Sequence, residues 1–381
     1  MKIALIGPAW PYRGGIAHHT NLLARALREM GHQVDVITFK RQYPKFLYPG
    51  TFQEEGGEVF GEICSERLID SMNPFNWLSV GKTLRKRGYD LYVFRFWIPL
   101  FGPLFGTIAR SVGGGPGRGR VLTILDNLIP HERRPGDRIF TNYQFRYCTL
   151  SITQSTTVHT QLKKRFPHIP VTTLPHPVYE HFGTPISKSK ARELVEIADR
   201  PTLLFFGFVR KYKGLDLLLE AIPEVVRRIP KVQLLVVGEF FGDPKPYLDI
   251  VQKHDLQDHI KIHNEFVPNE EVMKWFSASD LLVLPYRSAT NSGIVQIGHN
   301  FALPSVVTDV GSLSEVVVDG QTGFVISEAS PEHIAEAVEK AFLPGTLEKM
   351  SQAIVEERKK YSWEAFAKGV ISFVEKHLSV S

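Results

Sequence analysis

Cysteine is scarce in this sequence, since the 381 residues include only Cys64 and Cys148. A small secreted domain held by disulfides needs more of them, so a reducing, cytoplasmic setting fits the composition. Long apolar runs are missing too. No stretch of about 18 uninterrupted apolar residues occurs, which argues against a membrane-spanning helix. The apolar run after Met1 is too short for a secretory signal peptide.

Several functional patterns are also absent. The first glycine loop lacks the G-x-G-x-x-G dinucleotide spacing, and the chain has no Walker A loop, no G-x-S-x-G elbow and no nucleic-acid-binding module. No His, Cys and carboxylate cluster has metal-ligand spacing, so we expect neither a metal nor a cofactor. The formal net charge of +5 is compatible with an anionic substrate or an anionic lipid surface.

Strand-length apolar segments alternate with amphipathic helical segments along the whole chain. A strand at 2–6, a glycine-rich loop, a helix at 16–30 and a strand at 34–39 form a βαβ unit, which implies a parallel sheet. The length favours two cores, and a proline- and glycine-rich segment at 175–186 predicts the linker. We therefore expect two Rossmann-like, doubly wound α/β domains facing a cleft.

The remaining elements follow from the same alternation. Further strands are expected at 89–94, 121–125, 150–153 and 171–174, and then at 202–206, 232–237, 260–264, 281–284 and 305–308. Residues 40–74 are predicted to be loops. Segment 94–108, rich in Phe, Trp, Leu and Pro, predicts a buried helix; a hydrophobic acceptor channel or a membrane-facing patch is the alternative.

The stretch from Leu284 to Gly311 reads as a strand end, a polar turn, a helix and a second strand. Side-chain oxygens precede the helix, where N-caps belong, and Gly293 permits close approach to the backbone. A helix that begins just past a buried strand offers free N–H groups and the positive end of its dipole. We predict a diphosphate site here, although an ordinary βα turn would look similar.

A second turn of this kind, Gly207–Gly214, follows the strand at 202–206 and carries Arg210 and Lys213 beside a helix start. Cations together with free N–H groups are what a diphosphate requires. In the first half of the chain, Asp126 follows the carboxyl end of a strand, where ligands bind in open α/β sheets. His131 lies in the same loop, and a solvent-exposed bystander is the alternative for it.

Several of these segments resemble one known family. The Gly14-Gly15 loop, the Gly207–Gly214 turn and the run Leu303–Gly311 resemble motifs of the GT-B glycosyltransferases. The similarity is greatest to the retaining family 4, which includes many bacterial enzymes of cell-surface polysaccharide synthesis. Tyr361-Ser362-Trp363-Glu364 resembles the start of the C-terminal helix that crosses back to the first domain in that family.

The chain also departs from the family pattern. The family's paired glutamates fall at Ala289 and Ile297, and its loop arginine falls at Phe208, for which Arg210 is the plausible substitute. The polar segment between Ala289 and Ile297 is similar to that of a branch of the family that lacks the glutamates. For this chain, the resemblance implies that Thr290 or Gln296 contacts the sugar or the ribose.

The resemblance implies a retaining, metal-independent hexosyltransferase that uses a UDP or GDP sugar and a glycan or lipid-linked acceptor. The implied parts are an acceptor domain (1–178), a donor domain (186–361) and a crossing helix (362–381). The residues expected to take part in catalysis are Arg210, Lys213, His131 and Asp126. The residues expected to bind the donor are Gly15, Gly207, Glu239, Thr290, Asn291, Ser292, Gly293, Ile294, Gln296 and Glu315. The residues expected to bind the acceptor are His18, Asn127 and Glu132.

The expected setting is a cytoplasmic monomer or homodimer, located at an anionic inner-membrane face if the acceptor is lipid-linked. Nucleic acid is not expected as a partner. Two alternatives stay open. The first is a catalytically silent nucleotide-sugar-binding protein, and the second is a sugar-nucleotide epimerase or phosphorylase on the same fold.

Overall fold

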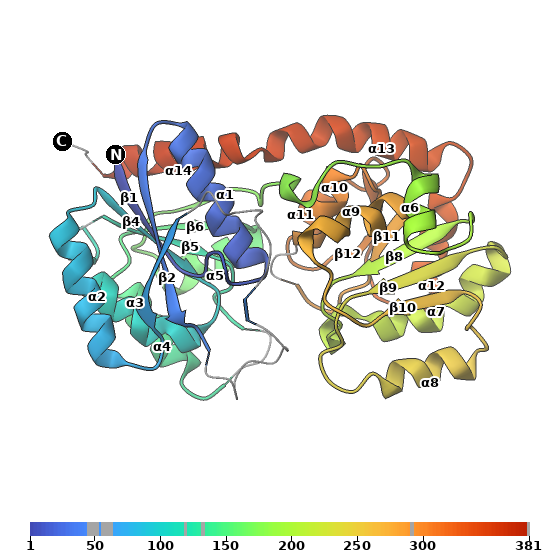
Figure 1. Cartoon of the computed structure of the whole chain (residues 1–381), viewed down its shortest axis with the longest axis horizontal. Helices are drawn as coiled ribbons and strands as arrows, with labels where there is room; N and C mark the ends of the chain where they lie inside the picture. Colours follow the sequence, from blue (N-terminus) through green and yellow to red (C-terminus); the bar gives the residue numbers. More distant parts are fainter. Residues whose placement is uncertain (44–52, 55–63, 118–119, 131–133, 290–292, 379–381) are drawn as a thin grey trace. The chain divides into compact units, whose positions relative to one another are not determined.

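In the computed structural model the chain divides into two α/β units (Figure 1). Unit 1 contains Met1–His176 together with Ser362–Ser381, and unit 2 contains Pro177–Tyr361. The structure describes residues 1–43, 53–54, 64–117, 120–130, 134–289 and 293–378. The predicted class of two doubly wound, Rossmann-like domains is confirmed by two separate parallel sheets.

Unit 1 contains a seven-stranded parallel sheet in the order β3-β2-β1-β4-β5-β6-β7. Its strands are β1 (Lys2–Ile6), β2 (Gln33–Arg41), β3 (Ser65–Asp70), β4 (Leu91–Phe96), β5 (Val121–Leu125), β6 (Leu150–Thr153) and β7 (Val171–Thr173). The prediction that residues 40–74 are all loops was wrong, because β3 pairs with β2 at the sheet edge. An edge strand needs no continuous apolar run, and most of β3 is polar and accessible.

The helices of unit 1 begin and end where local chemistry favours it. They are α1 (Gly15–Glu29), α2 (Pro74–Arg87), α3 (Gly102–Ser111), α4 (Asp137–Phe145), α5 (Thr156–Arg165) and α14 (Trp363–His377). Ser155 caps α5, since its hydroxyl accepts a hydrogen bond from Val158 N at 3.3 Å. Helices α2, α3 and α4 pack in a row, and α14 lies beside α1 (Figure 1).

Segment 94–108 forms the end of β4 and the buried helix that its composition predicts. Leu104, Phe105 and Ile108 of α3 are enclosed in the unit 1 core together with Phe39 and Phe94. The buried-helix interpretation therefore holds for this segment, and its apolar side chains stabilise the unit by packing.

Unit 2 contains a six-stranded parallel sheet in the order β10-β9-β8-β11-β12-β13. The strands are β8 (Thr202–Phe206), β9 (Gln233–Val237), β10 (Ile260–His263), β11 (Leu281–Leu284), β12 (Ser305–Thr308) and β13 (Gly323–Ile326). The helices are α6 (Lys188–Leu194), α7 (Leu215–Arg228), α8 (Lys245–Lys253), α9 (Asn269–Ala278), α10 (Gly293–Asn300), α11 (Leu313–Val316), α12 (Pro331–Ala341) and α13 (Thr346–Glu357). Four short elements, α4, α6, α11 and β13, were not foreseen, because so few residues show little periodicity.

Residues 177–185, expected to belong to the linker, lie within unit 2. The two segments at which the chain enters and leaves this unit pair with each other, since Val178 N donates to Tyr361 O at 2.9 Å. The final helix, α14, belongs to unit 1. Among the helices that the structure describes, none is both long and apolar enough to cross a membrane.

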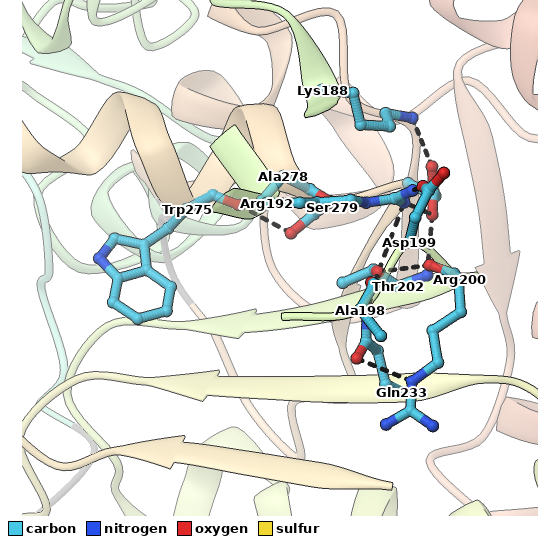
Figure 2. A network of polar contacts seen from close by, with 11 residues as sticks. Lys188, Arg192, Ala198, Asp199, Arg200, Thr202, Gln233, Trp275, Ala278 and Ser279 are labelled. Atoms are coloured by element: carbon cyan, nitrogen blue, oxygen red, sulfur yellow. Dashed lines mark hydrogen bonds and ion pairs between the residues drawn. The ribbon is translucent and has the colours of Figure 1, made fainter. Parts of the chain in front are cut away.

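A buried polar network fastens α6 to the amino-terminal edge of the unit 2 sheet (Figure 2). Arg192 is 7% exposed, and its guanidinium donates to Asp280 Oδ2 at 2.8 Å and to Ala278 O at 3.2 Å. Asp280 also accepts from Thr202 N at 2.8 Å and pairs with Lys188. The network holds α6 at the edge opposite the carboxyl ends of the strands.

Candidate active site

The loops after β8 and β9 meet at the carboxyl edge of the unit 2 sheet because two glycines permit it. Gly207 has φ +96°, and a Cβ there would lie 3.2 Å from Lys213 Nζ and 3.3 Å from Ile294 Cδ1. At Gly238 a Cβ would lie 2.4 Å from Gly207 O. A side chain at Gly238 would collide with backbone, and the positive φ at Gly207 favours glycine. The loops after β8 and β9 and the start of α10 are thereby gathered around Gly207.

Two cations of the β8 loop, Arg210 and Lys213, lie close to each other at this edge. Lys213 is 9% exposed, and its ammonium lies 5.6 Å from the centre of the Tyr286 ring. Among the residues that the structure describes, no carboxylate pairs with either cation. Burial, assisted by the nearby Arg210 charge, lowers the pKa of Lys213 to about 7. A buried cation without a counter-ion marks a place where an anionic ligand is favoured.

Helix α10 begins at Gly293, beside the β8 loop, and its second residue, Ile294, faces Gly207. The predicted donor residues Thr290, Asn291 and Ser292 lie outside the described residues.

Gln296, predicted to contact the sugar or ribose, lies on α10 with its side chain buried. Its side chain is 0% exposed, and neither polar atom of its amide has a hydrogen-bond partner in the described part of the chain. The structure therefore places the Gln296 side chain in the interior of unit 2, and its contact with the sugar or ribose stays a prediction.

The two predicted carboxylates of unit 2 lie on other loops of the same edge. Glu239 follows β9, and its backbone oxygen accepts a hydrogen bond from Val209 N at 2.9 Å. Glu315 lies exposed on α11, after β12. The parallel order of the sheet puts both after strand carboxyl ends, where ligands of such sheets bind.

In unit 1, Asp126 follows β5 and forms a buried ion pair, with 2.5 Å between its Oδ1 and Arg95 Nη2. Burial raises the pKa of Asp126, and the Arg95 guanidinium opposes that rise. Arg95 Nη1 also lies 3.1 Å from His19 Nδ1. On the other side of the ring, His19 Nε2 lies 2.7 Å from the side-chain amide nitrogen of Gln154.

His19 is the centre of this unit 1 network. Its ring is fully buried against His176, Trp363 and Phe366, at centroid distances of 5.2, 4.8 and 5.1 Å. Burial is the main cause that lowers the pKa of His19 far below its ordinary value, and Arg95 and His176 add to it. The ring is therefore neutral at physiological pH and acts as a fixed hydrogen-bonding group.

The other predicted residues of unit 1 lie near the same edge. Gly15 is the exposed first residue of α1, His18 is buried one turn further along, and Asn127 is half-buried beside Asp126. His131 and Glu132 lie outside the described residues.

Sequence reasoning missed Arg95 as the partner of Asp126, and it missed His19 and Gln154, which extend the network from Arg95. One signal was available, because Arg95 is a lone charge in an otherwise apolar strand, and such charges require a partner. Nothing in the spacing indicated that the partner would come from the next strand.

Two family profiles cover most of the chain. Residues 13–181 match the profile described as Glycosyltransferase Family 4, and residues 200–342 match the one described as Glycosyl transferases group 1. The chain belongs to the family 4 glycosyltransferases. The resemblance drawn from the motifs is thus confirmed at the level of the family.

Individual relatives of this family 4 chain are distant. A D-inositol 3-phosphate glycosyltransferase of Segniliparus rotundus is 30% identical over 193 residues, covering 49% of this chain and 43% of the relative. This chain therefore spans less than half the length of that relative. A glycosyltransferase of Methanocaldococcus jannaschii is 23% identical over 403 residues, covering 98% and 97% of the two chains.

Solved structures show the shared fold of the family 4 chain. Anabaena HepE, solved in complex with UDP and glucose, superposes with a TM-score of 0.76 at 16% identity, covering 99% of this chain and 100% of HepE. At that identity the likeness concerns the GT-B architecture alone.

Proposed function

We propose that this family 4 chain transfers a glycosyl group from a nucleotide-diphosphate sugar to a glycan or lipid-linked acceptor. Unit 2 binds the donor and unit 1 binds the acceptor. The donor is a UDP or GDP sugar, the transferred group is a hexosyl group, and the reaction retains the anomeric configuration. These finer assignments rest on the motifs of the sequence and on the chemistry of the two sheet edges.

The observation that carries the proposal is the pair of cations on the β8 loop. Arg210 and Lys213 lie together without a carboxylate partner in the described part of the chain, beside the start of α10. A nucleoside diphosphate leaves as an anion, and preorganised cations and N–H groups stabilise the charge that develops on it. Arg210 and Lys213 thus take the electrostatic role that a metal ion plays at other diphosphate sites.

On the acceptor side, the group with suitable chemistry is the Asp126 carboxylate. Arg95 favours its ionised form despite burial, so it can accept a hydrogen bond from an acceptor hydroxyl. Asn127 follows it and offers an amide for the same purpose. The acceptor reacts on the face of the sugar that the diphosphate leaves, so the reaction requires no enzyme nucleophile.

Donor binding and transfer are tested separately on the full chain. The melting temperature of the protein is measured with UDP-, GDP- and ADP-sugars, and the sugars of one base are expected to raise it. A ligand that binds only the folded state stabilises that state by mass action. Release of the free nucleoside diphosphate in the presence of a glycan or lipid-linked acceptor then measures transfer.

Three outcomes separate the alternatives. Stabilisation without turnover on any acceptor favours the silent binding protein. Conversion of the sugar nucleotide to an isomer, without release of the diphosphate, favours the epimerase. No stabilisation by any of these sugars contradicts the donor assignment itself.

We further propose that unit 1 rests on an anionic membrane surface through α2. One face of this helix exposes apolar and basic side chains together, and α2 contains no Asp or Glu. The exposed residues of this face are Phe75 (83% exposed), Leu78 (47%), Lys82, Arg85 and Lys86. Apolar anchors beside lysines and arginines suit the interface of an anionic bilayer.

The expected result is that the protein sediments with vesicles containing phosphatidylglycerol and not with pure phosphatidylcholine vesicles. The double substitution Phe75→Ser with Leu78→Ser is expected to weaken vesicle binding about tenfold or more, because apolar burial is lost. The matched control is Leu248→Ser, which removes a similarly exposed leucine from α8 of unit 2. Equal sedimentation of the double variant and the parent contradicts this role of α2.

A further inference from the structure

The segment after β9 supports the loop after β8 through an extension of the sheet. Val209 and Phe240 form a parallel bridge, Val209 N donates to Glu239 O at 2.9 Å, and Phe241 N donates to Val209 O at 2.9 Å. Phe240 is itself fixed, because its N–H donates to Asn264 Oδ1 at 2.9 Å and its ring packs edge-on against Tyr247. Backbone hydrogen bonds on both sides of Val209 thus set the position of Phe241.

The ring of Phe241 carries the side chain of Arg210. The guanidinium carbon of Arg210 lies 3.9 Å from the centroid of this ring, close enough for the ring face to attract the cation. No carboxylate in the described residues pairs with Arg210, so the ring is the partner that fixes its direction. The positive charge of Arg210 in turn helps to lower the pKa of Lys213.

We infer that Phe241 is a positioning residue for the diphosphate site, holding the Arg210 guanidinium toward the ligand through cation–π stacking. This inference rests on the proposed donor function and extends it to a residue on a second loop. Phe241 touches Arg210, and the role requires no contact between Phe241 and the donor.

A physical need for such a support follows from the position of the arginine. The family's arginine comes directly after the loop glycine, whereas here that position is Phe208 and the cation is displaced to Arg210. A long arginine side chain loses rotamer freedom when it binds an anion. Stacking on a fixed ring removes part of that freedom before the ligand arrives, so that binding costs less. The planar guanidinium keeps its edge N–H groups available while its face covers the ring.

The test is a double-substitution cycle on the full chain, with UDP-glucose and GDP-mannose as the probes and calorimetry as the measurement. Phe241→Leu is expected to weaken nucleotide-sugar binding about fivefold, because an exposed cation–π contact has roughly that effect on an equilibrium. Phe241→Trp, which keeps an aromatic face, is expected to retain the parent affinity. In an Arg210→Gln background, Phe241→Leu is expected to cause no further loss.

Phe240→Leu is the matched control, since it trims the neighbouring aromatic ring, which packs on Tyr247 instead of on Arg210. A loss in Phe241→Leu that persists with Arg210→Gln, or that Phe240→Leu reproduces, overturns the inference and indicates general support of the loop. Failure of Phe241→Trp to retain affinity also counts against it.

A ligand-free measurement separates this inference from the proposed function. In the nuclear magnetic resonance spectrum of the free protein, the Arg210 side-chain protons are expected to show an upfield ring-current shift that Phe241→Leu abolishes. If neither nucleotide sugar binds the parent, the donor proposal fails, and the presence of this shift still supports the positioning of Arg210. Absence of the shift in the parent overturns the inference whatever the binding result.

Discussion

Lys213→Ala is expected to weaken nucleotide-sugar binding about a hundredfold, the effect of losing roughly 3 kcal/mol from a charge-assisted contact with the diphosphate. The folded protein is expected to keep its stability or to gain some. The ammonium of Lys213 is buried beside Arg210 and has no carboxylate partner among the described residues, so folding removes it from water without compensation. Calorimetric titration measures the affinity, and thermal unfolding of the ligand-free variant measures the stability.

The matched control is Lys211→Ala, which removes an exposed cation from the same loop and is expected to change the affinity little. The pH dependence supplies a second check. The pKa of Lys213 is about 7 in the free protein, and an adjacent diphosphate raises it. Above pH 7, binding must therefore take up a proton, and the affinity of the parent falls by up to about tenfold per pH unit.

In Lys213→Ala this pH dependence is expected to disappear. Calorimetry in buffers of different ionisation enthalpy counts the proton directly. UDP-glucose is a suitable probe, because its diphosphate has no titration of its own near neutral pH. A parent that binds without proton uptake at pH 8 contradicts the assignment of Lys213 to the diphosphate.

Asp280→Ala is expected to destabilise unit 2 by about 3–5 kcal/mol, because it leaves the Arg192 guanidinium buried without its main partner. The Asp280 side chain is only 12% exposed, and it pairs with Arg192 and Lys188 and accepts a hydrogen bond from the backbone N–H of Thr202. A loss of that size corresponds to a fall in melting temperature of about 10 °C for a unit of this length. Thermal or urea unfolding of the full chain measures it.

Asp199→Ala is the matched control, because it removes a second carboxylate from the same arginine. The side chain of Asp199 is 90% exposed, and surface ion pairs contribute less than about 1 kcal/mol. Nucleotide-sugar affinity is expected to be unchanged in both variants where they are folded, since the network lies at the opposite edge of the sheet. Equal destabilisation by the two substitutions contradicts the assignment of the stabilising pair to Asp280.

The two parallel sheets could be predicted from the sequence because a buried parallel strand has a continuous run of apolar residues. Segments such as Leu281–Leu284 read directly as strands, and the turn expected at Gly207 has a positive φ there. The edge strand β3 was not predicted, because half of it faces water and its sequence therefore lacks a continuous apolar run. Short elements such as α6 are held by tertiary contacts, here those of Arg192, and have little pattern of their own.

Some features of the candidate site could likewise be predicted from the sequence, and others could not. Arg210 and Lys213 could be proposed because they share one short loop, and the structure does bring them together. The complete burial of the Gln296 side chain on α10 could not be read from its position in the sequence. The pairing of Asp126 with Arg95 joins residues 31 positions apart, and the support of Arg210 by Phe241 joins two different loops.

Unit 1 is built from both ends of the chain, and this has a consequence for its synthesis. Trp363 and Phe366 of α14 close around His19, which orients Arg95 and, through it, Asp126. A ribosome makes these two aromatic residues only after the whole of unit 2 has been synthesised. Unit 1 therefore cannot complete its core before α14 has been made, and it keeps an apolar surface uncovered until then.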